Sequence, residues 1–470
     1  MFKIGPSLYA LYDASPVPVR NVIGTVYALW SSQKKYGRHF GAWSGFLAQS
    51  QWWDREALRA FQVKQMQDLV AFIGEASPFY RTITQQRGIS RDTIRAPEDI
   101  KAFPIIDKPV VREHYAEIKT AEATDKFLVL ATSGTTGVSL HVPLTREALQ
   151  REYAFRWLFQ SIGGAKRGDR FALFTGHSVI PVKRKKPPFH IRNFADNAIM
   201  FSLYHMTDST LETYVKEFNE FKPQYVYGYP SGVFVLADYV RRTGKPLFSP
   251  KAVYTASEKL HRHQREVIEK AFSAPLYEWF GQVETTVNVQ ECSSHRLHVK
   301  EEYGYLELLK DDGSEAAPGE MGSVVGTGWG NRALPLIRYR TGDMMLLAAD
   351  QHCPCGRGGR IIEEIIGRDD DIIKTPDGRF IGRLDFVFKP IETIKERQIV
   401  QESLDSLLVR VVPTGEYGPK DEQRIIHELR SRIGDTIGIR VETVPEIPRS
   451  KGGKVRYVIS NVMNGYSKGK

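Results

Sequence analysis

Cysteine is nearly absent from this sequence: Cys292, Cys353 and Cys355 are the only three among 470 residues. Three thiols cannot form the disulfide framework of a secreted scaffold, so inert thiols or a metal site remain as alternatives. The sequence also lacks an uninterrupted apolar run of about 18 residues, which a membrane helix requires, and its first twenty residues lack a signal-peptide core. We therefore expect a cytoplasmic protein.

Acidic residues are the minority among the charged residues, with 55 Asp and Glu against 65 Lys and Arg and a formal net charge of +10. A basic excess suits a nucleic acid, an anionic membrane or a small polyanion such as ATP. No helix-turn-helix, zinc-finger or single-strand-binding pattern accompanies the excess, so we expect no nucleic-acid partner.

Residues 21–80 contain many aromatic side chains among basic ones, as in "VIGTVYALW" and "HFGAWSGFLAQSQWW". Two interpretations follow from this composition. The segment forms helices that pack on the main domain, or it forms helices that make peripheral contact with a membrane.

The length and the order of the patterns predict an α/β protein with two domains. Helical patterns up to about residue 80 are followed by strands alternating with helices, such as the strand "RFALFTG" (170–176) and a helix beginning with Ser257 as its N-cap. The strands "LLVRVV" and "GIRVETV" flank a helix over 421–433 that ends at Gly434. We expect a large N-terminal domain over 1–369, with 1–80 as a helical extension packed on it, and a small α+β domain over 370–470.

A loop rich in glycine and hydroxyl residues follows the predicted strand "KFLVLA" (126–131). Such a loop can bend sharply and present backbone N–H groups and hydroxyls to phosphate oxygens. The Walker pattern is excluded because no Gly-Lys-Ser/Thr followed by a helix is present. A plain Ser/Thr-rich turn remains the alternative. The loop residues are Thr132, Ser133, Gly134, Thr135, Thr136 and Gly137.

Three later segments offer the other groups that a nucleotide site needs. Asp343 in "YRTGDM" can accept hydrogen bonds from ribose hydroxyls, and Glu284 in "FGQVE" can hold Mg²⁺. Lys454 in "IPRSKGGKVR" lies in a glycine-rich loop from which a cation can reach a site. Taken singly, each has an ordinary alternative: an N-cap, a surface glutamate and a solvated basic tail.

Taken together and in order, "TSGTTG", "TASEKL", "WFGQVE", "YRTGD", "GRDDDII" and "PRSKGGKVR" resemble the core motifs of the acyl-adenylate-forming superfamily. The stretches "YGYPSGVFVLADYV" and "CPCGR" are similar to the phenylacetate:CoA ligase-like branch. "IIKTPDGRFIGRLDFVFK" is similar to a subgroup associated with capsular-polysaccharide genes.

The resemblance implies a role for each matching residue. The loop from Thr132 to Gly137 would hold the ATP phosphates, Glu284 would bind Mg²⁺, and Lys454 would reach the carboxylate and the α-phosphate. Asp370 would be the hinge of a mobile lid domain. The remaining nucleotide-binding residues would be Ser257, Glu258, Phe280, Gly281, Asp343 and Arg368.

The implied reaction is ATP-dependent activation of a carboxylate through an acyl-AMP, followed by transfer to CoA or to an amine. Val138 stands after the loop where many relatives carry a lysine, and Val283 replaces the usual threonine before Glu284. These departures leave a second hypothesis open, a catalytically weakened nucleotide-binding or membrane-docking scaffold in cell-envelope assembly. Tyr227, Gly228 and Tyr229 would form a wall of the acyl pocket or belong to the ordinary core.

The cysteines can be interpreted with nearby histidines. Three thiolates and one imidazole complete a closed tetrahedral Zn²⁺ site. "ECSSHRLH" offers His295 and His298, and "HCPCG" offers His352 beside its two cysteines. Similar segments in the resembling branch favour one set as zinc ligands: Cys292, His298, Cys353 and Cys355.

Overall fold

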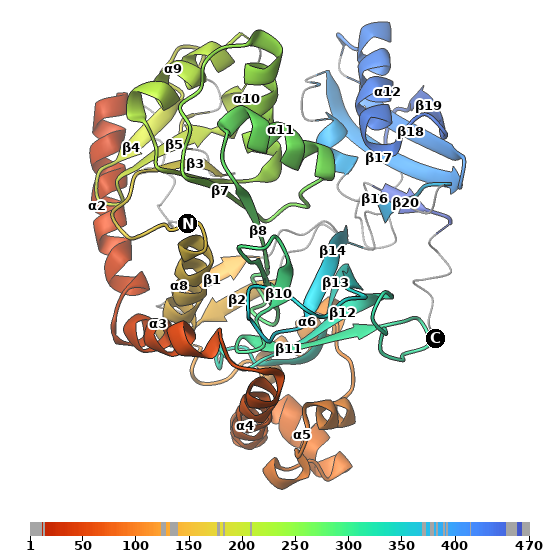
Figure 1. The fold of residues 1–470 in the computed structure, drawn as a ribbon. Helices are drawn as coiled ribbons and strands as arrows, with labels where there is room; N and C mark the ends of the chain where they lie inside the picture. Colours follow the sequence, from red (N-terminus) through yellow and green to blue (C-terminus); the bar gives the residue numbers. More distant parts are fainter. Residues whose placement is uncertain are drawn as a thin grey trace.

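The fold is taken from a computed structural model, shown in Figure 1. The structure describes residue 12 and residues 15–123, 128–131, 140–175, 179–181, 184–206, 209–368, 373–376, 380–381, 384–388, 391, 393–413, 415–447 and 458–462. Three sequence predictions lie outside these residues: the Thr132–Gly137 loop, the hinge at Asp370 and the cation Lys454.

The described helices are α2 (Val17–Lys35), α3 (Arg38–Ser50), α4 (Arg55–Ala76), α5 (Pro78–Arg87), α6 (Lys108–Glu113), α7 (Tyr115–Ile118), α8 (Arg146–Ser161), α9 (Leu211–Phe221), α10 (Pro230–Thr243), α11 (Arg262–Phe272) and α12 (Pro419–Ile433).

The first strands are β1 (Leu128–Ala131), β2 (His141–Leu144), β3 (Phe171–Thr175), β4 (His190–Asn193), β5 (Ala198–Ser202), β6 (Tyr225–Gly228), β7 (Ala252–Ala256), β8 (Leu276–Gly281), β9 (Asn288–Glu291) and β10 (Leu297–Val299). The others are β11 (Gly304–Leu309), β12 (Met321–Gly328), β13 (Leu336–Leu347), β14 (Ile361–Arg368), β15 (Ile373–Lys374), β16 (Phe380–Ile381), β17 (Ile394–Ser403), β18 (Ser406–Pro413), β19 (Gly438–Thr443) and β20 (Val458–Ser460).

A twelve-stranded sheet in the order β11-β12-β13-β14-β10-β9-β8-β7-β6-β3-β5-β4 forms the centre of the large unit. Strands β5, β3, β6, β7 and β8 run parallel. From β8 outward through β9, β10, β14, β13 and β12 to β11, each neighbouring pair is antiparallel, and so is the pair of β4 and β5. The predicted α/β class is confirmed.

The parallel strands are buried on both faces because successive side chains point to opposite sides of the sheet. Val226 and Val253 pack in one apolar cluster with residues of α9, α10 and α11. Their neighbours Tyr225 and Tyr254 pack in another cluster with Phe159 of α8. Helices therefore cover both faces of this part of the sheet, with α9 to α11 on one side and α8 on the other (Figure 1).

The N-terminal helices pack on the large unit. The Gln150 side chain of α8 accepts hydrogen bonds from the backbone N–H groups of His39 and Phe40 and donates to the Lys34 carbonyl. Further along, the Tyr80 hydroxyl of α5 donates to the Pro335 carbonyl at 3.2 Å. These contacts support the packed interpretation of residues 21–80, which remains a prediction. The part of the chain that the structure describes contains no helix long and apolar enough to cross a membrane.

A separate four-stranded sheet in the order β19-β18-β17-β20 carries α12. Ile425, Leu429 and Ile433 of α12 are fully buried in its core, at the spacing that the sequence predicted. Gly434 follows the helix with φ of 83°, a value that glycine adopts without a Cβ clash, and so ends the helix as predicted. The boundary at 369/370 and the motion of this unit as a lid remain predictions.

Candidate active site

Three adjacent parallel strands end at one edge of the large sheet. Their register pairs Gly228 of β6 with Thr255 of β7, and Thr255 with Glu278 of β8. Ligands of open α/β sheets bind beyond the carboxyl ends of the strands. Here those ends carry all of the motif residues predicted for the acyl pocket and the adenine: Tyr227, Gly228, Tyr229, Ser257, Glu258, Phe280 and Gly281.

Ser257 does not cap a helix, and this prediction was wrong. Its φ is 71°, in the left-handed region, and α11 begins only at Arg262, with His261 as its N-cap. A non-glycine residue in this region is strained and occurs mainly in turns and functional sites. The chain therefore turns sharply directly after β7 and leaves Ser257 to Leu260 as a loop at the edge of the sheet.

This loop is fixed to the antiparallel half of the sheet. The Lys259 ammonium lies 2.6 Å from Oε1 of Glu364 in β14, and only 7% of the Lys259 side chain is exposed. The Leu260 N–H donates to Glu278 Oε1 at 3.4 Å. β14 is therefore connected to the predicted adenine loop, although more than a hundred residues separate the two in sequence.

Glu284 follows β8 and is buried, with 7% of its surface exposed. The hydroxyl of Tyr339 in β13 donates to Glu284 Oε1 at 3.3 Å. A carboxylate held by a tyrosine beneath the sheet edge is a suitable oxygen ligand for Mg²⁺. Tyr339 is the first residue of the "YRTGD" motif, but the sequence analysis gave it no role, because nothing in the sequence shows that it contacts a residue 55 positions earlier.

Asp343 lies on the same strand as Tyr339, after Gly342 with φ of 78°. It pairs in register with Arg368 at the end of β14, and its N–H donates to Thr341 Oγ1 at 3.0 Å. The half-buried Asp343 thus stands beside the strand that contacts the β7–α11 loop. β13 and β14 carry the two residues predicted for the ribose.

The strands on either side of the predicted phosphate loop are described. β1 and β2 pair antiparallel, with Ala131 opposite His141. The apolar cluster that contains Leu140 and Tyr339 is the one against which Val283 packs. The ends of the hairpin therefore belong to the same packing unit as the residues next to Glu284.

Glu278 is a half-buried carboxyl that the sequence analysis did not select. Burial, reinforced by the nearby Glu291 carboxylate, raises the pKa of Glu278 to about 7. Glu291 itself accepts hydrogen bonds from the Arg265 guanidinium at 2.8 Å and from the Glu278 N–H at 2.6 Å. The sequence shows that Glu278 belongs to the strand β8. Only the pairing of β8 with the distant strand β9 shows that the Glu291 carboxylate lies near it.

The acyl-pocket residues differ in their surroundings. Tyr227 is buried, and the Arg156 guanidinium carbon lies 4.3 Å from the centre of its ring. A Cβ on Gly228 would meet the Phe174 carbonyl oxygen at 2.6 Å, so only glycine fits at the end of β6. Tyr229 directly precedes α10, and its N–H donates to the same carbonyl at 2.8 Å. Arg156 adds a positive charge that the aromatic motif did not predict.

The four predicted zinc ligands lie together. Cys292, His298, Cys353 and Cys355 place their ligand atoms within 4.8 Å of one another. The Cys292 and Cys353 sulfurs are 3.6 Å apart, and Cys355 Sγ is 3.4 Å from His298 Nε2. Zinc–sulfur bonds of about 2.3 Å in a tetrahedron separate two sulfurs by about 3.8 Å, so the donor set fits zinc. Burial lowers the pKa of His298 to about 4, which leaves the imidazole neutral at pH 7, the form that binds metals.

The other two histidines considered for zinc lie outside this set. His295 Nδ1 is 2.8 Å from Glu291 Oε1, which raises the pKa of His295. His352 is exposed, and its N–H donates to the Asp350 carboxylate.

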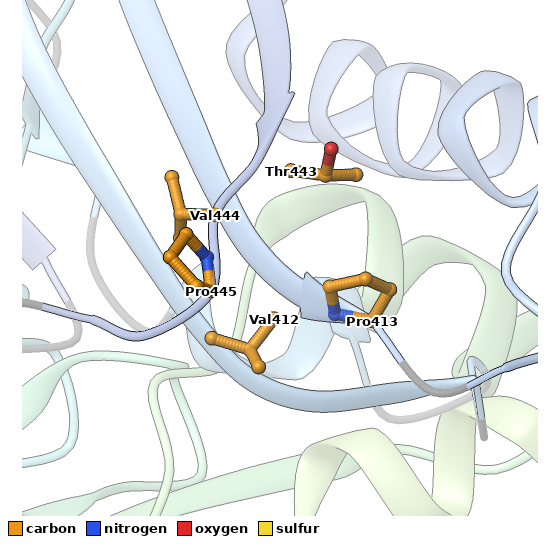
Figure 2. Close-up of a pocket in the computed structure, with 5 residues that line it drawn as sticks. All are labelled: Val412, Pro413, Thr443, Val444 and Pro445. Carbon is orange, nitrogen blue, oxygen red and sulfur yellow. The ribbon is translucent and has the colours of Figure 1, made fainter.

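A hollow at one end of the C-terminal sheet is distinct from these sites. Figure 2 shows that its lining side chains come from the ends of β18 and β19. Thr443 supplies the one polar side chain among them, so we assign no chemistry to this hollow. The lining residues are Val412, Pro413, Thr443, Val444 and Pro445.

Comparisons with known proteins agree with this arrangement. A solved structure of 2-hydroxyisobutyryl-CoA ligase, in the postadenylation state with an AMP adduct, has a TM-score of 0.59 and 21% identity, with 88% of this chain and 92% of that chain covered. The chain therefore has the fold of this ligase. Together with the relatives that follow, this fold confirms the predicted resemblance to the acyl-adenylate-forming superfamily.

Two relatives are similar to this chain over most of its length. The chain is 25% identical to Protein CapK of Staphylococcus aureus over 460 residues, covering 96% of this chain and 99% of the relative. It is 28% identical to a phenylacetate-coenzyme A ligase of Thermus thermophilus, covering 86% of this chain and 97% of the relative. Residues 373–461 match the family model of the CapK C-terminal domain.

Proposed function

We propose that this protein is an ATP-dependent ligase that activates a carboxylate as an acyl-AMP and then transfers the acyl group to a thiol or an amine. One observation carries the proposal most directly. The buried Glu284, which follows β8, is hydrogen-bonded to Tyr339 on β13, the strand that also carries Asp343.

The adenylation step has a clear electrostatic difficulty. A carboxylate that attacks a polyphosphate meets like charge, so catalysis depends on positioning and on charge neutralisation. Phe280 would stack on the adenine, with Ser257 and Glu258 along its edge, and Asp343 would accept hydrogen bonds from the ribose hydroxyls. Glu284 would hold Mg²⁺, which neutralises phosphate charge when bound. Lys454 would supply a cation to the carboxylate and the α-phosphate.

We favour CoA over an amine as the acceptor, because the ligase relatives named above are CoA ligases. The name of the Staphylococcus relative supports a role in capsular or other surface polysaccharide synthesis. We place the reaction in the cytoplasm, where ATP and CoA are supplied.

We further propose that the four-residue Cys/His cluster holds a structural Zn²⁺. The ligands come from the end of β9, from β10 and from the segment that leads into β14. A closed site of this type crosslinks the strands that follow Glu284 to the strand that ends at Arg368.

The test is pyrophosphate release from ATP with aryl, fatty, hydroxy and amino acids, each with and without CoA. Acid-dependent release without CoA identifies adenylation, and thioester formation on adding CoA identifies the acceptor. If the acid that gives the highest release yields a hydroxamate with hydroxylamine but no thioester with CoA, the acceptor is an amine. If no acid stimulates release, the ligase proposal is wrong.

The scaffold alternative is favoured by the missing loop lysine, by Val283 and by one observation on the surface. The outward face of α2 is apolar. Membrane contact and catalysis are compatible, so acid-dependent release of AMP decides between an enzyme and an inactive scaffold.

A further inference from the structure

The helix α2 presents its apolar side to the outside of the molecule. Six of the eleven large hydrophobic side chains that are exposed in the described part of the chain lie on this single helix. Their spacing of three and four residues places them on one face. They are Val19 (45% exposed), Val22 (59%), Ile23 (37%), Val26 (60%), Leu29 (58%) and Trp30 (51%).

The inward side of α2 buries polar side chains together with Val17 and Ala28, whereas an ordinary surface helix buries an apolar face. Arg20 and Ser31 are buried, with 2% and 6% of their surfaces exposed. Asn21 Oδ1 accepts the Arg192 N–H at 2.8 Å, and Thr25 Oγ1 accepts the Phe194 N–H at 3.1 Å. These contacts fix the helix on β4, so the outward face is a defined surface. Phe194, which is 66% exposed, lies next to it.

Cationic groups lie at the C-terminal end of this face, and no acidic residue occurs between residues 14 and 53. Lys34 and Lys35 occupy the last turn of α2, with the Lys34 ammonium 3.9 Å from the centre of the Trp30 ring. Near the first turn, Val17 packs with Val179 and Ile180.

We propose that α2 docks this protein flat on an anionic lipid surface, with its apolar face at the level of the acyl boundary and the lysines at the headgroups. Helices with an apolar face that includes tryptophan and a basic surround bind in this way. The 19 residues of α2 span about 28 Å, enough to lie along the surface over its whole length. This inference does not depend on the ligase proposal.

A second copy of the chain is a poorer occupant. A two-fold contact across α2 places each end of the helix beside an end of its mate. The mate offers no acidic residue between residues 14 and 53 to pair with Lys34 and Lys35, so such a contact leaves these charges uncompensated. An anionic surface instead complements them.

The experiment is flotation of the full-length protein with vesicles of phosphatidylcholine alone and of phosphatidylcholine with phosphatidylglycerol. We expect binding to the anionic vesicles, weakened at high salt, and much less binding to the neutral ones. The double variant Val22→Glu/Val26→Glu should bind at least about tenfold more weakly, because two charges then lie in the apolar interface. Quenching of tryptophan fluorescence by brominated lipid should fall in Trp30→Phe.

Leu404→Glu is the matched control, since Leu404 is 42% exposed in the turn between β17 and β18, in the C-terminal sheet. It should bind vesicles like the unmodified protein, and all variants should keep the same unfolding temperature. No binding of the unmodified protein to anionic vesicles would overturn the proposal. So would a lipid-free dimer that the double variant abolishes, since the face would then belong to a second copy.

Discussion

The hydroxyl of Tyr339 donates to the buried carboxylate of Glu284 at 3.3 Å, and this contact joins the segment after β8 to β13. Four residues beyond Tyr339, the same strand carries Asp343. Substitution of Glu284 or Tyr339 therefore tests whether this contact is needed for catalysis.

We expect Glu284→Gln to lower acid-dependent AMP release by about a hundredfold, because a ligand of the phosphate-bound cation is lost. Tyr339→Phe should cost only about tenfold, since the hydroxyl positions Glu284 without touching the reacting atoms. Both variants should need more Mg²⁺ for half-maximal rate. Glu363→Gln, on the exposed side of β14, is the control. Normal Mg²⁺ dependence in Glu284→Gln would remove Glu284 from the site.

Lys454→Ala should abolish carboxylate-dependent pyrophosphate exchange and leave the unfolding temperature unchanged. The loss of one cation from a charge-neutralising site raises the barrier by roughly 3 kcal/mol or more. Lys451→Ala tests whether any lysine of "PRSKGGK" suffices, and it should retain exchange. Near-normal exchange in Lys454→Ala would exclude this residue from adenylation.

The Cys/His cluster should hold one zinc ion per chain, measured on protein purified without added metal. Chelation, or the substitution Cys353→Ser, should lower the unfolding temperature by about 5 °C or more, because the crosslink between strands is lost. His352→Ala is the control, since this exposed neighbour is outside the cluster and its loss should leave zinc bound. Metal-free protein whose melting ignores a chelator would contradict the zinc site.

Glu278 should make stability depend on pH. Burial and the Glu291 carboxylate raise its folded pKa from 4.5 to about 7, so the folded state keeps a proton that the unfolded state loses. Stability must then fall as pH rises from about 4.5 to about 7. Glu278→Gln should reduce the difference in unfolding free energy between pH 5 and pH 8 by on the order of 1 kcal/mol. Urea titrations at the two pH values measure it.

Glu266→Gln provides the comparison for this measurement, because Glu266 lies 63% exposed on α11. Its variant should keep the pH dependence of the unmodified protein. If Glu278→Gln keeps it as well, another group is responsible.

Local patterns predicted the parts of the fold whose causes are local. The helix α12, its stop at Gly434 and the strand predicted over 170–176 all appear where the sequence placed them. The four residues proposed as metal ligands could be selected because segments similar to "CPCG" and "ECSSHRLH" occur in the branch that the sequence resembles.

Other features depend on contacts between distant segments. The turn at Ser257 is dictated by the contacts of Lys259 and Leu260 with β14 and β8, so the favourable capping pattern of the sequence did not prevail. The spacing of the apolar residues in α2 forms one apolar face, but such spacing cannot tell which face packs inward. The side chains of Asn21 and Thr25 determine which face packs inward, because they accept hydrogen bonds from the backbone at β4.

Those two side chains have a consequence for solubility during and after synthesis. β4 is the last strand of the twelve-stranded sheet, and a bare outer strand is a template on which a foreign strand can add. Asn21 and Thr25 are one helical turn apart, about 6 Å, which matches the spacing of about 6.6 Å between alternate residues of a strand. Asn21 and Thr25 accept hydrogen bonds from the outward N–H groups of Arg192 and Phe194. These two backbone donors are then no longer available to a strand of another molecule that would add at the sheet edge.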